Sequence, residues 1–525
     1  EDKIKNYYTF FKFRELKSKD QKLTDFFGIK DIKDNFILTS KNKRIAVLKV
    51  STINFSIKSD KEKEAIIKSF QKFLNSLDFP IQILMNTESV ELDEYLNSLK
   101  LRLNNPKFGS LFEEYKKHLH QTIKTNKIMN RVFYVIIPED ADIGIQINIC
   151  IERLSGLNIR SRQLNSIELR KLLLSFFKGN GMGKLLEAIF PEYIHNHIDN
   201  LEINNQYQRI VYASGYPRYA ESGFLDRIIS SLGDFDLSIH LKPYPIEGML
   251  IGLNRELQKQ RADLYAMQMK GAINPSLEIQ YSDTKGTLED LQKGKDRLFN
   301  VSLYVNCKAN SLKELNLLTK KVESELNSLM ILPRVPYFRM IQGLKSISPL
   351  GVDKLDYNRN ITTEALSAFF PFTSQFLEVD NKGVWLGLNK NNIPIIKDIF
   401  GLSNPNGLVL AQSGGGKSYF CKLLITRYLL NGTKVMIIDP QGEYKPLVSH
   451  FEGQTIDLSK DSNTIINPLD LMGHDYIEKR LSLMDLMKIM LGDLSDIQKA
   501  FIDKALTITY ELKGITKNPD SWNNE

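Results

Sequence analysis

Residues 407–418 read Gly-Leu-Val-Leu-Ala-Gln-Ser-Gly-Gly-Gly-Lys-Ser, and residues 434–444 read Lys-Val-Met-Ile-Ile-Asp-Pro-Gln-Gly-Glu-Tyr. The first stretch combines an apolar strand at 408–410, a glycine-rich turn and the start of a helix, which is the setting of a phosphate-binding loop. The three glycines free the backbone to turn its N–H groups toward phosphate oxygens. We therefore expect a nucleotide to be bound by Ala411, Gln412, Ser413, Gly414, Gly415, Gly416, Lys417, Ser418 and Tyr419.

The residues after the glycines supply the charge and the metal ligand that such a loop needs. Lys417 places a positive charge beside the β- and γ-phosphates of ATP, and the Ser418 hydroxyl is the expected Mg2+ ligand. A predicted helix at 417–430 adds the positive end of its dipole, and Asn431-Gly432 ends that helix. Ala411 stands where the first glycine is usual, and alanine is the smallest alternative. A glycine- and serine-rich turn without a ligand is the other interpretation, but strand, loop, lysine-hydroxyl pair and helix all agree with the first.

A second polar cluster follows the next apolar run. Residues 435–438 are continuously apolar, as in a parallel strand that is buried on both faces. Open α/β sheets place catalytic groups at the carboxyl ends of such strands. We predict that Glu443 positions the attacking water and that Asp439 shapes the turn or the outer shell of the metal, so that Lys417, Glu443 and Asp439 are the catalytic candidates. A polar turn that caps the strand is the alternative.

Bulk properties limit the remaining classes of function. A chain of 525 residues with 42% hydrophobic and 25% charged residues predicts two to four globular domains. The net charge of +8 permits contact with anionic lipid or nucleic acid without requiring it. Three widely spaced cysteines favour a reducing compartment. No apolar run reaches transmembrane length, and the start at Glu1 suggests a part of something longer.

The front half predicts two α+β units of ferredoxin-like type. Within 1–160 we expect strands at 36–38, 44–57, 81–84 and 132–137, with helices at 61–77 and 108–125. A helical connector at 161–207, with a helix at 166–177, leads to a second unit at 208–350. There we expect strands at 209–213, 235–241, 298–307 and 335–344, helices at 224–232 and 312–329, and a helical insertion at 248–270.

The rear half predicts the first part of a P-loop domain at 365–470, with a strand at 383–388, followed by helices at 481–491 and 497–512 within a helical region at 471–525. A Walker B strand ending in Asp-Glu is not found, since the nearest candidate, 489–493, has helical periodicity. Truncation explains this better than loss of the strand.

Several other motifs resemble functional sites but favour structural roles. Gly179–Lys184 has no preceding strand and no hydroxyl after its lysine, which indicates a flexible turn. The pairs His118/His120 and His195/His197 have a spacing that puts their side chains on different sides of a helix, so metal binding is not expected. Trp385 and the Phe369–Phe372 cluster indicate core packing, with a wall against the nucleotide base as the weaker alternative.

Taken in order, these motifs resemble a known family. The order is Ser-Ala-Phe-Phe-Pro-Phe at 367–372, the P-loop at 411–418, Asp-Pro-Gln-Gly-Glu-Tyr at 439–444 and Ile-Asn-Pro-Leu-Asp at 466–470. The chain is similar to the VirB-four class of conjugation and type IV secretion ATPases, within the HerA–FtsK superfamily. The resemblance implies a RecA-like α/β core with an all-helical insertion after Asp470, and an arginine finger and Walker B further downstream.

The same resemblance implies how the protein works. It implies Mg2+-dependent ATP hydrolysis, assembly into a hexamer or smaller ring, and a cytoplasmic, peripheral position on the inner face of the membrane. Inner-membrane secretion components would be the docking partners, with DNA or protein as the transported substrate. Two alternatives stay open, namely a HerA- or FtsK-like DNA-translocating motor and a nucleotide-binding assembly module without turnover.

Overall fold

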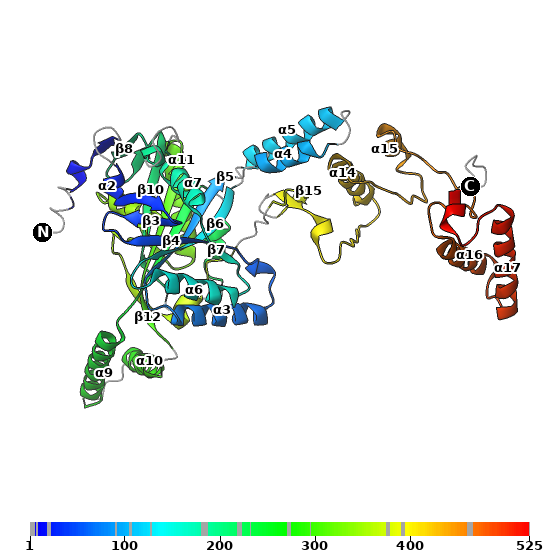
Figure 1. Ribbon diagram of the computed structural model, residues 1–525. Coiled ribbons are helices and arrows are strands. Elements are labelled where there is room, and N and C mark those ends of the chain that lie inside the picture. The colour runs from blue at the N-terminus through cyan, green and yellow to red at the C-terminus, as the bar shows by residue number, and fades with distance from the viewer. Residues whose placement is uncertain are drawn as a thin grey trace. The chain divides into compact units, whose positions relative to one another are not determined.

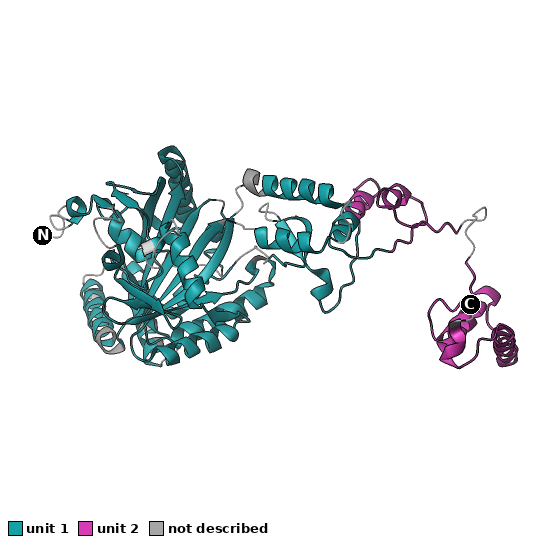
Figure 2. Cartoon of the chain, turned by 45° about the horizontal axis from the view of Figure 1, so that its top comes forward, with its two compact units in different colours: residues 1–410, 423–435 teal, residues 411–422, 436–525 magenta. Residues whose placement is uncertain are grey.

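The computed structural model describes residues 6, 9–17, 23–89, 92–103, 108–126, 129–179, 187–217, 223–231, 233–269, 275–293, 296–373, 379–389, 394–458 and 466–523. Figure 1 shows the helices and strands along the chain, and Figure 2 colours its two compact units. Unit 1 comprises residues 1–410 and 423–435, and unit 2 comprises residues 411–422 and 436–525. Within the described ranges, every helix is too short or too polar to span a lipid bilayer.

The front of unit 1 contains a β-α-β-β-α-β arrangement, in which the sequence predicted the first three strands and the first helix but not the second helix or the fourth strand. Its elements are β4 (Arg44–Val50), α3 (Asp60–Asn75), β5 (Ile81–Ser89), β6 (Met129–Pro138), α6 (Ile143–Ser155) and β7 (Ser161–Gln163). The strands pair in the order β7–β4–β6–β5. Counted along the chain this order is fourth, first, third, second, and we describe it as ferredoxin-like.

The same arrangement occurs a second time in unit 1. Its elements are β10 (Gln206–Gly215), α8 (Asp226–Ile229), β11 (Phe235–Pro243), β12 (Leu298–Ala309), α11 (Leu312–Ser328) and β13 (Leu332–Arg334). The strands pair in the order β13–β10–β12–β11, which again is fourth, first, third, second. The chain therefore contains an internal duplication of fold.

The two copies are joined edge to edge through their second strands. Strands β5 and β11 pair antiparallel from Ile81↔Leu241 to Met85↔Leu237. The result is one 14-stranded sheet with the order β1-β8-β9-β10-β12-β11-β5-β6-β4-β3-β2. The further strands of this sheet are β1 (Glu15–Lys17), β2 (Ile29–Lys33), β3 (Phe36–Thr39), β8 (Tyr193–Asn196), β9 (Leu201–Ile203) and β14 (Arg359–Thr362).

Alternate side chains of this sheet pack into two separate cores. In β6, Phe133 and Val135 belong to one core, and Tyr134 and Ile136 belong to the other. Helices α3, α6 and α11 contribute to the first core, while α2 (Leu23–Phe27), α7 (Ser166–Phe177) and α12 (Met340–Ile347) contribute to the second. Since helices cover both faces, the central strands are buried on both sides: in β11 every residue from 235 to 241 is buried, and Asp236, Ser238 and His240 are among them.

Each ferredoxin-like copy carries a pair of helices between its second and third strands. The α4–α5 arm consists of α4 (Asp93–Leu101) and α5 (Gly109–Asn126), and the α9–α10 arm consists of α9 (Ile246–Met269) and α10 (Pro275–Gln292). Both arms are visible in Figure 1. The sequence predicted α5 and α9 and missed α4 and α10.

Two predicted strands of unit 1 are wrong in part or in whole. The strand expected at 335–344 is replaced by helix α12, because Met340, Ile341, Leu344 and Ile347 are buried at the spacing of one helical face. The strand expected at 44–57 ends at Val50, and residues 55–57 form a single 3-10 turn.

The rear of the chain is mainly helical. It contains the hairpin β15 (Val384–Leu388) and β16 (Pro394–Lys397), the short helix α13 (Thr363–Ser367), and helices α14 (Lys417–Leu430), α15 (Lys445–His450), α16 (Tyr476–Leu491) and α17 (Asp496–Leu512). Helices α16 and α17 pack around Leu483, Leu506 and Tyr510, and the Tyr510 hydroxyl donates to the carbonyl of Leu469 at 2.6 Å.

The strands predicted at 408–410 and 435–438 are not formed. Both runs lack regular structure, and their apolar side chains are open to solvent, with Leu410 82% and Met436 91% exposed. A strand requires a neighbour that accepts and donates its backbone hydrogen bonds. Among the described residues, no segment pairs with either run.

Candidate nucleotide-binding site

The predicted phosphate loop forms a tight turn directly before helix α14. Two of its glycines, Gly414 and Gly416, have φ values of +78° and +82°, a region that side chains with a Cβ rarely adopt. Gly415 donates its N–H to the carbonyl of Gln412 at 3.0 Å. A Cβ on Gly415 would lie 3.0 Å from that same carbonyl oxygen and 3.2 Å from the Ala411 Cβ. The loop conformation therefore requires glycine at these positions.

Helix α14 begins at the residue that follows the last glycine. Lys417 is its first residue and is exposed, Ser418 is half-buried, and Tyr419 is 74% exposed. Residues 411–416 are exposed as well. The first N–H groups of a helix have no partner within the helix, so this end of α14 favours an anion. The structure thus places Lys417 and Ser418 at the start of α14, directly after the glycine turn, and their roles toward a nucleotide stay a prediction.

The Asp439–Tyr444 segment folds into a turn that the Asp439 side chain holds. The Asp439 carboxylate accepts from the N–H of Tyr444 at 2.8 Å and from the N–H of Gln441 at 3.3 Å, and Gly442 has a φ of +73°. Asp439 therefore shapes this turn, which is one of the two roles that its sequence position predicts.

The same turn contacts the first turns of helix α14. The Lys422 ammonium lies 5.4 Å from the centre of the Tyr444 ring, a cation–π distance. Burial and the neighbouring Cys421 thiol raise the pKa of the Tyr444 hydroxyl. The turn at 439–444 therefore lies beside the first turns of α14, with Tyr444 as the contacting residue.

Glu443 is exposed, and its charge adds to the raised pKa of the neighbouring Tyr444 hydroxyl. Its role in positioning water stays a prediction, as does any role of Asp439 toward a metal. Both depend on where the nucleotide lies.

The aromatic cluster before the P-loop is core rather than site. Phe370 and Phe372 are fully buried and pack on Phe70 of helix α3, with ring centres 5.3 and 6.2 Å apart. Trp385 is 4% exposed and lies in a separate apolar cluster. The packing interpretation is confirmed, and the alternative of a wall against the nucleotide base is wrong for the phenylalanines.

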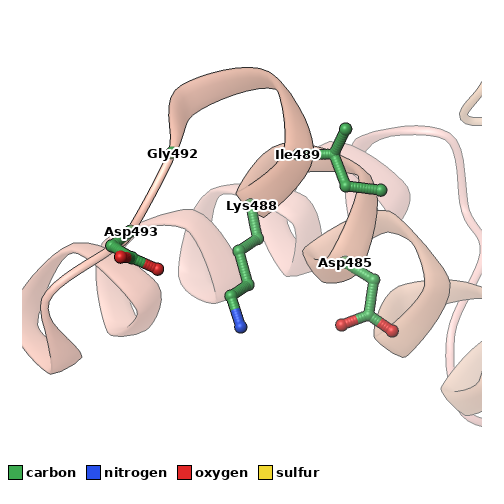
Figure 3. A pocket seen from close by; sticks show the side chains of 5 residues that line it. All are labelled: Asp485, Lys488, Ile489, Gly492 and Asp493. Carbon is green, nitrogen blue, oxygen red and sulfur yellow. The ribbon is translucent and has the colours of Figure 1, made fainter.

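The remaining motifs are the two histidine pairs and the glycine motif at 179–184. No group of three or more histidine, cysteine or acidic side chains suited to a metal occurs in the part of the chain that the structure describes. His195 is 3.2 Å from Glu15 across the β1–β8 pair. Residues 180–184 of the glycine motif lie outside the described residues. A shallow cavity of about 510 Å³ lies at the end of helix α16, lined by Asp485, Lys488, Ile489, Gly492 and Asp493 (Figure 3).

Two family models match separate parts of the chain. Residues 386–522 match the model of the central domain of helicase HerA, and residues 30–157 match the archaeal TraC-like domain. These matches support a HerA–FtsK-superfamily conjugation ATPase. A comparison with curated proteins finds no match.

The matches coincide with elements of the structure. The HerA-like region contains the glycine loop, helix α14 and the Asp439 turn, and extends through the helical region to α17. The TraC-like region contains most of the first ferredoxin-like copy together with the α4–α5 arm. The second copy, from β10 to β13, lies outside both regions, and only the strand order reveals its relation to the first.

Proposed function

We propose that this protein is an ATPase that energises a type IV secretion or conjugation machine, in channel or pilus assembly and in substrate transfer. The main support for this proposal is the conformation of the glycine loop. Two glycines with positive φ lead directly into Lys417 and Ser418 at the start of helix α14, inside the region that matches HerA. The archaeal TraC-like match in the front part supports the conjugation class.

The residues of the loop suit Mg2+-ATP. The backbone N–H groups of residues 414–416 and the first turn of α14 would bind the phosphates, and the Lys417 ammonium would neutralise the charge that develops at the γ-phosphate. The Ser418 hydroxyl would hold Mg2+, which supplies charge neutralisation between the β- and γ-phosphates. Glu443 would orient the attacking water, and Asp439 would keep the Glu443 turn in shape through its two backbone hydrogen bonds.

The proposal includes a RecA-like arrangement of the HerA-like region and assembly into a hexamer or smaller ring. The exposed apolar runs at 408–410 and 435–438 support it, because burial of such side chains is favourable by about 25 cal/mol for each Å² removed from water. We further propose that the protein works on the inner face of the membrane, docked to inner-membrane secretion components and acting on a DNA or protein substrate.

Substitution of the loop lysine tests the proposal. Lys417→Ala is expected to weaken the binding of a fluorescent ATP analogue at least tenfold and to abolish phosphate release, because the charge at the phosphates is lost. Lys434→Ala, which removes an exposed lysine beyond the end of α14, is the matched control and should bind like the wild type. Equal binding by the wild type and Lys417→Ala would overturn the proposal.

The HerA match favours one second candidate, a DNA-translocating motor. That function predicts hydrolysis that is stimulated by duplex DNA and falls steeply with salt, since phosphate contacts release counterions. Stimulation by DNA would favour the motor over the secretion ATPase. Binding of ATP without phosphate release in the complete protein would instead indicate an assembly module.

A further inference from the structure

The α4–α5 arm packs against the C-terminal end of helix α14, the helix that follows the glycine loop. Residues 423–435 of the chain, which include the second half of α14, belong to unit 1 together with this arm. Leu430, the last residue of α14, is 2% exposed, and Ile396 of strand β16 is fully buried. These two residues form one apolar cluster with the arm. The buried members of this cluster are Leu92, Tyr95, Leu96, Leu99, Phe112, Leu119, Trp385, Ile396 and Leu430.

Arg102, at the end of α4, donates a hydrogen bond to Asn431, the residue directly after α14. Its guanidinium donates to the Asn431 side-chain oxygen and to the carbonyl of Asn381, and also to the carbonyl of Ser98 at 3.0 Å. Asn431 in turn donates to the carbonyl of Lys382 at 3.0 Å. One arginine thus connects the arm, the loop before β15 and the C-terminal end of α14.

Arg427, in the last turn of α14, makes the second connection. Its guanidinium carbon lies 4.3 Å from the centre of the Trp385 ring, and it donates to the Trp385 carbonyl. The Trp385 ring also meets Tyr115 of α5 edge-on at 6.1 Å, and the Tyr115 and Tyr95 hydroxyls are 2.8 Å apart. Both arginines place positive charge at the end of the helix where the dipole favours it.

We infer that the α4–α5 arm is a clamp that positions the P-loop helix and couples nucleotide binding to the large sheet. The inference rests on the proposed function. Helix α14 is continuous from Lys417 to Leu430, and Arg427 follows Lys417 by about 15 Å along a rod of 1.5 Å rise per residue. A helix of this length transmits a shift at its first turn to its last. The arm joins strands β5 and β6 directly, and β5 pairs with β11 of the second copy.

The α9–α10 arm provides an internal control, because it occupies the equivalent position in the second copy. It has exposed apolar side chains, among them Ile251, Tyr265 and Met269. None of the residues that the structure describes in this arm belongs to the cluster around Leu430. Nucleotide binding is therefore expected to affect the α4–α5 arm and to leave the α9–α10 arm unchanged.

Hydrogen exchange measured by mass spectrometry on the full chain tests the clamp. With a non-hydrolysable ATP analogue and Mg2+, residues 93–101 and 109–122 should exchange more slowly in the wild type. The protection should disappear in the double variant Arg102→Met/Arg427→Met and persist in Arg255→Met, which changes an exposed arginine of α9. By reciprocity, the double variant should bind the analogue about fivefold or more weakly, and Arg255→Met less than twofold.

The outcomes separate this inference from the proposed function. If the wild type binds no analogue, the proposed function and the clamp both fail. If it binds the analogue with unchanged exchange in the α4–α5 arm, the clamp alone is overturned. If β5 and β6 of the double variant exchange as they do in the wild type, the double variant is folded. The single variant Arg427→Lys keeps a cation over Trp385, so it should retain part of the protection of the α4–α5 arm that the double variant loses. If the double variant loses protection but binds with wild-type affinity, the arm only packs on α14 and does not position it.

Discussion

At the scale of single residues, the least expected feature is a buried ionic cluster beside the seam between the two ferredoxin-like copies. The Lys308 ammonium of β12 is 2.9 Å from Asp236 and 3.2 Å from Asp234. Burial alone would lower the pKa of Lys308, but the two aspartates raise it. Arg131 of β6 donates to the carbonyls of Phe235 and Gly233 at 3.1 and 2.8 Å. Because β6 belongs to the first copy and these partners to the second, the cluster links the two.

Breaking this cluster is expected to cost far more than breaking a surface pair. Lys308→Met would leave the Asp236 carboxylate, which is 1% exposed, without its ammonium, and should lower the free energy of unfolding by about 3 kcal/mol or more. Lys293→Met, which breaks an exposed pair with Glu289, should cost less than about 1 kcal/mol. Urea denaturation followed by circular dichroism measures both. Equal losses would show that burial does not make this ion pair more important for stability than an exposed one.

Glu168 gives the stability a defined dependence on pH. Hydrogen bonds from the Arg162 guanidinium, and then from the N–H of Asn165, lower the pKa of Glu168 from 4.5 to about 2. A carboxyl with a lowered pKa stabilises the fold above its unfolded value, and this contribution is lost as the pH falls from 4.5 toward 2. Glu168→Gln keeps an acceptor for the capping box of α7 but removes the charge. We expect it to be less stable than the wild type by about 0.5–1 kcal/mol at pH 7, by urea denaturation, and this difference should shrink as the pH falls toward 2. A constant difference would contradict this.

At the scale of elements, the two helical arms are insertions into ferredoxin-like copies that are otherwise complete. Strands β11 and β12 pair in register up to Pro243↔Phe299, and the Tyr244 N–H donates to the Leu298 carbonyl at 2.9 Å. The strands are therefore already aligned as a hairpin without the α9–α10 arm.

Removing the α9–α10 arm should consequently leave the sheet intact. A variant in which residues 246–295 are replaced by Asn-Gly, so that these two residues and Asp296 form a three-residue hairpin loop, is expected to unfold cooperatively and to lose only helical signal in circular dichroism. Asp296 is kept, since its carboxylate accepts from the Glu364 N–H at 3.0 Å. Loss of cooperative unfolding would show that the arm is needed to form the sheet.

The element scale also shows where local patterns mislead. Residues 335–344 contain enough Val, Tyr, Phe and Ile to predict a strand, yet the chain forms helix α12 from Met340. Burial of Met340, Leu344 and Ile347 against the second core decides the matter, because packing outweighs differences in intrinsic preference. The same limit applies to 435–438, where an apolar run predicts a strand but no described neighbour pairs with it.

At the scale of the whole molecule, the sequence by itself indicated the glycine loop and most of the local structure. A glycine loop with Lys417 and Ser418 can be recognised without coordinates, because the backbone conformation it needs depends on which residues lack a Cβ. Two α+β repeats could likewise be predicted, because helices and strands impose periods of 3.6 and 2 on the apolar residues. The family resemblance depended on the same local motifs.

Only the tertiary structure showed that the two repeats form one sheet through β5 and β11, and that the α4–α5 arm holds the far end of α14 through Arg102 and Arg427. Both are contacts between residues far apart in the chain, Met85 with Leu237 and Arg102 with Asn431. Local periodicity shows which face of a strand or helix is apolar and does not identify the partner that covers it. The partner is decided by the closure of long loops and the packing of distant side chains, whose free energies belong to the folded chain as a whole.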